Sequence, residues 1–84
     1  MARRLAEPQE IKVRTSINGV PVSLVRNGRS ERIAAVYQQW RASDSWWGKE
    51  VERHYFRVRT NMGLVCDIFR DTVDSHWFLS EIHD

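Results

Sequence analysis

The stretch RHYFRVRT at residues 53–60 decides the fold class, because its side chains alternate in character along the chain. One face would carry His54, Phe56, Val58 and Thr60, and the other Arg53, Tyr55, Arg57 and Arg59. A period of two is typical of a strand with one buried face. The loop Asn61-Met62-Gly63 follows, with a glycine for a left-handed position, and LVCDIF at 64–69 alternates again. The two stretches therefore predict a β-hairpin.

The same pattern recurs on both sides of this hairpin. Residues 11–17 and 20–24 alternate, and Asn18-Gly19 between them is a tight-turn signal. Pro21 has no backbone donor, so its strand should lie at an edge or pair incompletely there. Residues 76–82 form the last predicted strand after a polar turn at 71–75. We place Trp77 of that strand in the core.

The segment 29–41 allows two interpretations. Ile33, Val36, Tyr37 and Trp40 have the i, i+3, i+4, i+7 spacing of an amphipathic helix, which Ser30 could cap. Asn27-Gly28, however, lies between two apolar runs and indicates a hairpin turn. A β-bulge near Ala34-Ala35 would reconcile the spacing with a strand. We favour a strand, and an α+β fold with a helical segment 30–41 is the alternative.

The sequence thus predicts an all-β fold, a small, strongly bent antiparallel sheet or partial barrel of about six strands. A chain of 84 residues is too small for a two-sheet sandwich. Closing one curved sheet on itself is the natural alternative, because closure removes exposed edges. Residues 1–9 are expected to form a flexible polar tail, and residues 10–84 a single small β domain. Residues 41–50 are expected to be a loop.

Composition excludes some classes of protein but assigns no particular function. Residues 1–60 hold twelve of the thirteen basic side chains against six acids, and residues 61–84 hold one against five, so the charges are +6 and −4. The lone Cys66 allows no internal disulfide, and no apolar run approaches the roughly 18 residues of a membrane span. We expect a cytoplasmic protein with no membrane association.

Several motifs together resemble a known family. They are Trp40-Arg41, Trp46-Trp47, residues 53–60, Gly63, Arg70-Asp71 and Trp77-Phe78-Leu79. Their order over residues 20–84 resembles a family of small bacterial proteins of unknown function. It also resembles the C-terminal β domain of the inactive Y-family polymerase homologues of bacterial mutasomes. That resemblance implies a compact β domain that acts by binding in translesion DNA synthesis, and Ser75-His76 and Cys66 depart from its pattern.

The first candidate site is the outward face of the central hairpin. Aromatic rings that alternate with arginines are the elements of a nucleic-acid surface, because rings stack on bases and guanidinium groups bind phosphate. The candidate nucleic-acid-binding residues are Arg53, Tyr55, Arg57, Arg59 and Phe69. The alternative is an ordinary sheet face, in which Arg57 or Arg59 pairs with Asp67 across the strands.

The second candidate site is the tandem pair Trp46-Trp47, a partner-binding anchor. Neighbouring residues of an extended segment point in opposite directions, so one ring could remain exposed and contact another protein. The alternative is that both rings fold over an open end of the sheet.

Catalytic or metal chemistry is not indicated. His54, His76, His83 and Cys66 have no metal-binding spacing, and Asp67, Asp71 and Asp74 bracket a polar turn. We therefore expect no enzyme activity and no cofactor. The predicted function is a binding module for DNA or RNA, accessory to DNA repair or replication. The alternative is a protein-interaction adaptor or homodimer, with a partner in the repair or replication machinery.

Overall fold

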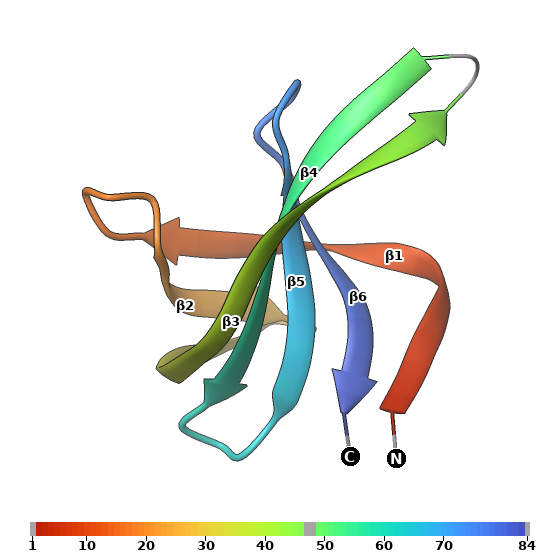
Figure 1. Ribbon diagram of the computed structural model, residues 1–84. Coiled ribbons are helices and arrows are strands. Elements are labelled where there is room, and N and C mark those ends of the chain that lie inside the picture. Colours follow the sequence, from red (N-terminus) through yellow and green to blue (C-terminus); the bar gives the residue numbers. More distant parts are fainter. Residues whose placement is uncertain (1, 47–48, 84) are drawn as a thin grey trace.

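The computed structural model describes the backbone of residues 2–46 and 49–83 and the side chains of residues 7–43 and 50–83. These residues form six strands and no helix (Figure 1): β1 (Ala2–Thr15), β2 (Pro21–Arg26), β3 (Arg29–Trp46), β4 (Lys49–Thr60), β5 (Val65–Asp71) and β6 (Trp77–His83). The predicted all-β fold is confirmed. The helical alternative for residues 30–41 is wrong, because they lie within β3 and pair with both neighbouring strands.

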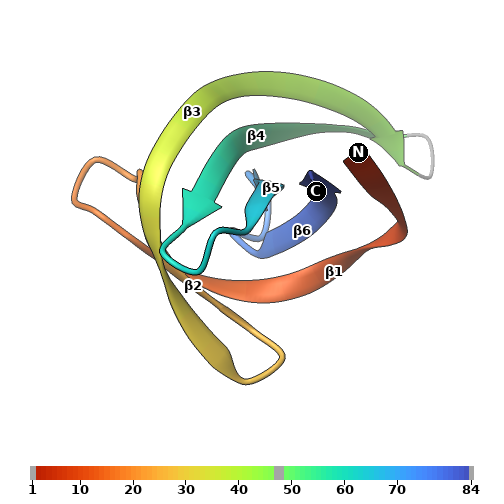
Figure 2. The ribbon, with the colours of Figure 1, turned by 90° about the horizontal axis from the view of Figure 1, so that it is seen from below.

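The six antiparallel strands hydrogen-bond in a closed ring in chain order, with β6 returning to β1 (Figure 2). Two sheets make up the ring, a five-stranded sheet β1-β6-β5-β4-β3 and a three-stranded sheet β1-β2-β3. The long strands β1 and β3 bend and take part in both sheets. Bulges in β3 between Ile33 and Ala35 and between Val36 and Gln38 help it to bend.

Residues 2–9 differ from the expected polar tail, because they lie in β1 and pair with β6. Ala2 lies opposite His83 and Arg4 opposite Glu81, and the pairing resumes at Gln9 after an irregular stretch. Pro8 in this stretch has no N–H to donate to the ladder. A strand of this kind is held by backbone hydrogen bonds, and the alternation of side chains therefore gives no sign of it.

The predicted turns are confirmed. Asn27 and Gly28 both have positive φ, 52° and 76°, as a two-residue turn matched to the strand twist requires. Gly63 has φ 88° in the turn between β4 and β5. Thr60 holds that turn, because its hydroxyl accepts hydrogen bonds from the backbone N–H groups of Met62 and Leu64. The same hydroxyl donates to the buried Glu31 at 2.8 Å.

The core lies inside the ring. Its buried side chains are Ile11, Leu24, Phe56, Val58, Cys66, Ile68, Trp77 and Leu79. The predicted inward face of β4 is confirmed by Phe56, Val58 and Thr60, of which at most 1% is exposed. The core position of Trp77 is confirmed as well, since its ring packs 5.6 Å from that of Phe56.

Strands β3 and β4 extend into a two-stranded arm beyond the ring (Figure 1). Pairing between β4 and β5 stops at Arg53, whereas pairing between β3 and β4 continues to Trp46 and Lys49. The loop expected at residues 41–50 is therefore wrong for most of its length. Trp47 and the side chain of Trp46 lie outside the described residues, so the predicted tryptophan anchor stays a prediction.

Candidate binding surface

The outer face of the five-stranded sheet, opposite the core, carries a row of four aromatic rings. These rings, the aromatic row, are Trp40, Tyr55, Phe69 and Phe78, and they come from β3, β4, β5 and β6 in that order. Each residue lies directly opposite the next in the strand register. The successive ring centroids are 5.2, 5.0 and 5.2 Å apart, and the rings of Trp40 and Tyr55 are nearly parallel. The row is therefore continuous across four strands.

Phe69 is the innermost member of this row, and the face that was expected to stack a base is covered. Only 2% of the residue is exposed. Tyr55 and Phe78 flank its ring, and the guanidinium carbon of Arg53 lies 4.6 Å from the ring centroid. Phe69 instead packs between the rings of Tyr55 and Phe78 and supports them. Trp40, Tyr55 and Phe78 remain half-exposed.

Arg57 is committed to a contact within the protein. Its Nε donates to Oδ1 of Asp67 at 2.8 Å and its Nη2 to Oδ2 at 3.2 Å. This hydrogen bond raises the pKa of Arg57, which burial alone would lower. Such two-point pairing gives directional strength to an ion pair. Arg57 therefore forms the cross-strand pair with Asp67 that was the alternative to phosphate binding. Its guanidinium carbon also lies 5.7 Å from the ring centroid of Trp40.

Of the other arginines, Arg59 lies on the same face as the aromatic row, whereas Arg41 follows Trp40 and points to the opposite face, the face of His54. Arg59 is exposed and its Nε donates to the hydroxyl of Tyr37 at 2.8 Å. Arg41 pairs with Glu52 at 3.1 Å, but 72% of the arginine side chain is exposed. Exposed ion pairs of this kind contribute about 0–1 kcal/mol to stability. Arg59, whose contact with Tyr37 is also exposed, can exchange that partner for a phosphate on the face of the aromatic row.

A hollow of about 260 Å³ opens next to the aromatic row. Its lining residues are Pro8, Val51, Arg53, Phe69, Asp71 and Phe78. The walls are mainly apolar, and Arg53 and Asp71 supply a cation and an anion at its edge. A planar ring with polar substituents fits these features in size and chemistry.

The structure brings Arg53, Tyr55, Arg57 and Phe69 to one face, as the alternation predicted, with Arg59 at its end. Sequence reasoning missed Trp40 and Phe78. The signal for Phe78 was available, because it alternates with the core residues Trp77 and Leu79. The partnership of Trp40 with Tyr55 could not be predicted, since bulges shift the register between β3 and β4.

Nucleophilic and nuclease chemistry finds little support among the other candidates. Burial raises the pKa of the Cys66 thiol to about 12, so the reactive thiolate is strongly disfavoured. Asp71 accepts a hydrogen bond from the backbone N–H of Val73 at 2.8 Å, as expected of a polar turn. Asp67 is paired with Arg57.

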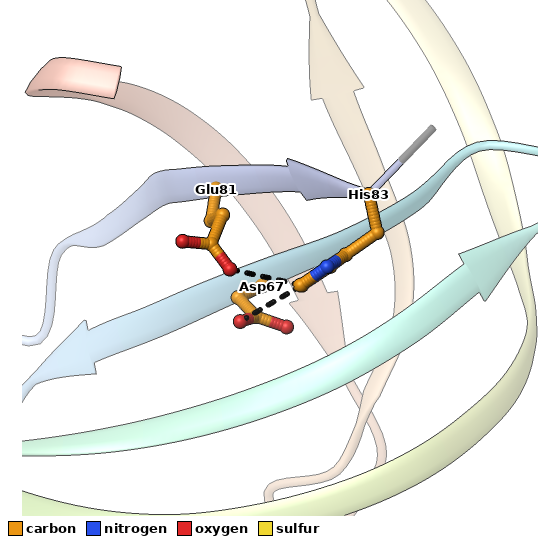
Figure 3. A group of neighbouring side chains, drawn as sticks. All are labelled: Asp67, Glu81 and His83. Carbon is orange, nitrogen blue, oxygen red and sulfur yellow. Dashed lines mark ion pairs between the residues drawn. The ribbon is translucent and has the colours of Figure 1, made fainter. Parts of the chain in front are cut away.

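One group of metal-ligating side chains does assemble on the outer face. Asp67, Glu81 and His83 each offer one ligand atom, and these atoms lie within 4.8 Å of one another (Figure 3). This group could not be predicted from the sequence, because the three residues come from two strands and have no motif spacing. Among the described side chains, His54, His76 and Cys66 join no such group.

Comparison with known families assigns the chain. A family model, Domain of unknown function (DUF6504), matches residues 1–84. The chain belongs to this family. The expected relationship to a family of unknown function is confirmed. In this DUF6504 member the family match covers the whole chain, whereas the motif resemblance covered residues 20–84. No curated protein and no solved structure gave a match. The described part of the chain has no helix of the length and apolar character that a membrane crossing requires.

Proposed function

We propose that this DUF6504 protein is a non-enzymatic binding module for single-stranded nucleic acid. The observation that carries the proposal is the aromatic row, with arginine guanidinium groups over two of its four rings. A positively charged surface with aromatic side chains is the usual means of binding single strands, in which bases are free to stack.

Each part of the surface has a distinct role in this proposal. The half-exposed rings of Trp40 and Phe78 stand at the two ends of the row, where each has one face without an aromatic neighbour in the row. A base stacks on each of these end faces. The hollow beside Phe78 receives the ring of a further base, and Arg59 contacts a phosphate of the same strand.

We propose the biological setting on the basis of the motif resemblance and of the charge. The similarity to the C-terminal domain of inactive Y-family polymerase homologues supports an accessory role in DNA repair or replication in the bacterial cytoplasm. The charge of +6 on residues 1–60 supports association with a polyanion. DNA and RNA both carry the chemistry that this surface recognises, and the binding experiment compares them.

Fluorescence-anisotropy titration of labelled 12-nucleotide single strands of DNA and RNA, and of a DNA duplex, tests the proposal. The titrations run at low and at physiological salt, because phosphate contacts weaken steeply as salt rises. The test variants are Trp40→Ala, Phe78→Ala and Arg59→Ala. The matched control for Arg59→Ala is Arg14→Ala, at an exposed arginine away from the aromatic row. Thermal melting shows that each variant is folded.

Loss of a stacked base is expected to weaken single-strand binding by about 1–3 kcal/mol in Trp40→Ala and Phe78→Ala. Arg59→Ala should bind more weakly and with a shallower salt dependence, while the control Arg14→Ala keeps the wild-type affinity. Equal affinity of all variants, or preference for the duplex, would reject the aromatic row as the binding surface.

The projecting arm favours protein interaction as a second candidate. Over residues 33–46, no described strand pairs with the edge of β3 that faces away from β4. An open edge of this length can accept a strand from a partner or from a second copy. Size-exclusion chromatography with light scattering tests the homodimer, and Trp46→Ala and Trp47→Ala test the tryptophan anchor. A monomer at all concentrations would exclude self-association.

A further inference from the structure

A second site, independent of the aromatic row, lies one register position further along the same face. Asp67 of β5 lies directly opposite Glu81 of β6, and His83 follows two residues after Glu81. Since residues two apart in a strand point to the same face, all three side chains project together on the outer side of the sheet (Figure 3). The three residues form the cluster that we call the Asp-Glu-His cluster.

We propose that the Asp-Glu-His cluster binds a divalent metal ion of the zinc class, with water in the remaining position. Nε2 of His83 lies 3.1 Å from Oδ2 of Asp67 and 3.3 Å from Oε2 of Glu81. In a tetrahedral site with ligands about 2.0–2.2 Å from the metal, neighbouring ligand atoms are about 3.3–3.6 Å apart. Two of the three ligand separations are thus close to those of a bound site. The third separation, between the two carboxylate oxygens, is at most 4.8 Å.

The His83 nitrogen supplies a second observation. Nε2 is fully buried, and neither carboxylate contact has hydrogen-bond geometry, so the atom is left without a hydrogen-bond partner. A buried polar atom that is unsatisfied raises the free energy of the folded state. Nε2 lies within ion-pair distance of both carboxylate oxygens, so the three ligand atoms are placed to share a metal ion.

Arg57 holds the metal ligand Asp67 in position. Its two hydrogen bonds fix the carboxylate plane, as outer partners commonly do for metal-binding carboxylates. The two carboxylates supply two negative charges, of which that of Asp67 is shared with the guanidinium of Arg57. About a quarter of the Glu81 side chain and 22% of the His83 side chain are exposed, which gives the ion a path from solvent.

The position of the cluster gives the ion a structural consequence. Glu81 and His83 are the partners of Arg4 and Ala2 in the ladder between β6 and β1. An ion that links β5 to this end of β6 would therefore also order the beginning of β1. At this point the ring is closed by backbone pairing of the polar segment that begins β1. The ion would therefore add stability at the ring closure, where the sequence predicts little side-chain packing.

Isothermal titration calorimetry of the full, untagged chain with zinc chloride tests the proposal. Metal content after dialysis, measured by mass spectrometry, gives the stoichiometry. Glu81→Gln and His83→Gln remove one ligand each with little change in volume. The matched control is His76→Gln, because His76 is exposed and lies 3.2 Å from a single carboxylate, that of Glu10. Asp67 is left unchanged, since Arg57 depends on it.

One zinc ion per chain is expected for the wild type and for His76→Gln, with binding weakened by about tenfold or more in Glu81→Gln and His83→Gln. The absorption of bound cobalt(II) should show four-coordinate geometry. Absence of stoichiometric zinc, or equal zinc binding by Glu81→Gln and the wild type, would overturn the proposal. If His83→Gln does not fold, Glu81→Gln alone decides. Nucleic-acid binding has a separate readout, so either proposal can fail without the other.

Discussion

Strands β5 and β3 differ in burial although both contain apolar and aromatic residues at strand-favouring positions. In β5, consecutive residues from Cys66 to Phe69 are all buried, on both faces of the strand. In β3, Val36 is 36% exposed and Tyr37 is 57% exposed. The comparison shows that position in the sheet decides burial here more than the side chains themselves do.

The physical cause is the number of neighbours. β5 lies at the centre of the five-stranded sheet, and long side chains from β4 and β6 close over its outer face. The segment of β3 beyond Ile33 pairs on one side only, with β4. The outward-facing residues of β5 therefore lie in a second, thin packing layer on the outer side of the sheet. This outer layer consists of aromatic rings and ion pairs, whereas the core inside the ring is the inner layer.

The largest expected effect on stability comes from a substitution in the inner layer, the core inside the ring. Trp77→Ala should lower the free energy of unfolding by about 3–5 kcal/mol, because it leaves a large cavity beside Phe56. The exposed aromatic residue of β3 is the control: Tyr37→Ala should change stability by about 0.5 kcal/mol or less. Urea denaturation measures both. Similar losses in the two variants would contradict the contrast between the centre and the edge of the sheet.

A smaller effect tests the outer layer of β5. Arg57→Met should lower the free energy of unfolding by about 1–3 kcal/mol, because it leaves the buried Asp67 carboxylate without its main partner. The double variant with Asp67→Asn should recover part of that loss, since no charge then remains buried.

A double-mutant cycle from urea denaturation gives the coupling between Arg57 and Asp67. Arg32→Met, at an exposed arginine of β3, is the matched control and should have little effect. Additive losses in Arg57→Met and Asp67→Asn would show that the outer layer contributes nothing through this pair.

The turn that places β5 beside β4 should respond more weakly. Gly63→Ala is expected to lower stability by about 1 kcal/mol, because an alanine is strained at φ 88°. A Cβ atom at this position meets nothing within 4 Å, so the strain comes from the backbone alone. Met62→Ala in the same turn is the control. A neutral Gly63→Ala in thermal melting would mean that the turn adopts another conformation.

The smallest expected effect concerns His54, at the base of the arm. Burial lowers the pKa of His54 below 6.5, and the positive charges of Arg41 and Arg70 lower it further. Because the folded chain then binds a proton less readily than the unfolded chain, stability should fall as the pH drops through 6.5 towards the folded pKa. Titration of the histidine signals by NMR gives the pKa directly, and His54→Gln should reduce the loss. A pKa at or above 6.5 would contradict the packing of His54.

Much of the fold could be predicted because it depends on local signals. The alternation at 53–60 and 64–69, the turn at Asn27-Gly28 and the core position of Trp77 each follow from a few neighbouring residues. Residues 2–9 could not be predicted in this way. Their place in β1 depends on backbone pairing with β6, which lies at the other end of the chain.

The candidate site was predicted in part for the same reason. Alternation places Tyr55 and the arginines on one face, but it does not say which neighbours will cover that face. Phe69 was expected to be accessible and is buried, because Arg53 and the rings of β4 and β6 close over it. The Asp-Glu-His cluster needed the register between β5 and β6, which shifts after Asp67.

The sequence by itself determined that this chain forms short antiparallel strands, where most of them turn, and which face of each central strand enters the core. These properties depend on the backbone freedom of single residues and on a period of two. Only the tertiary structure decided the ring closure, the aromatic row and the Asp-Glu-His cluster. These features require register between strands far apart in the sequence, and that register is fixed by bulges and by packing of the whole domain.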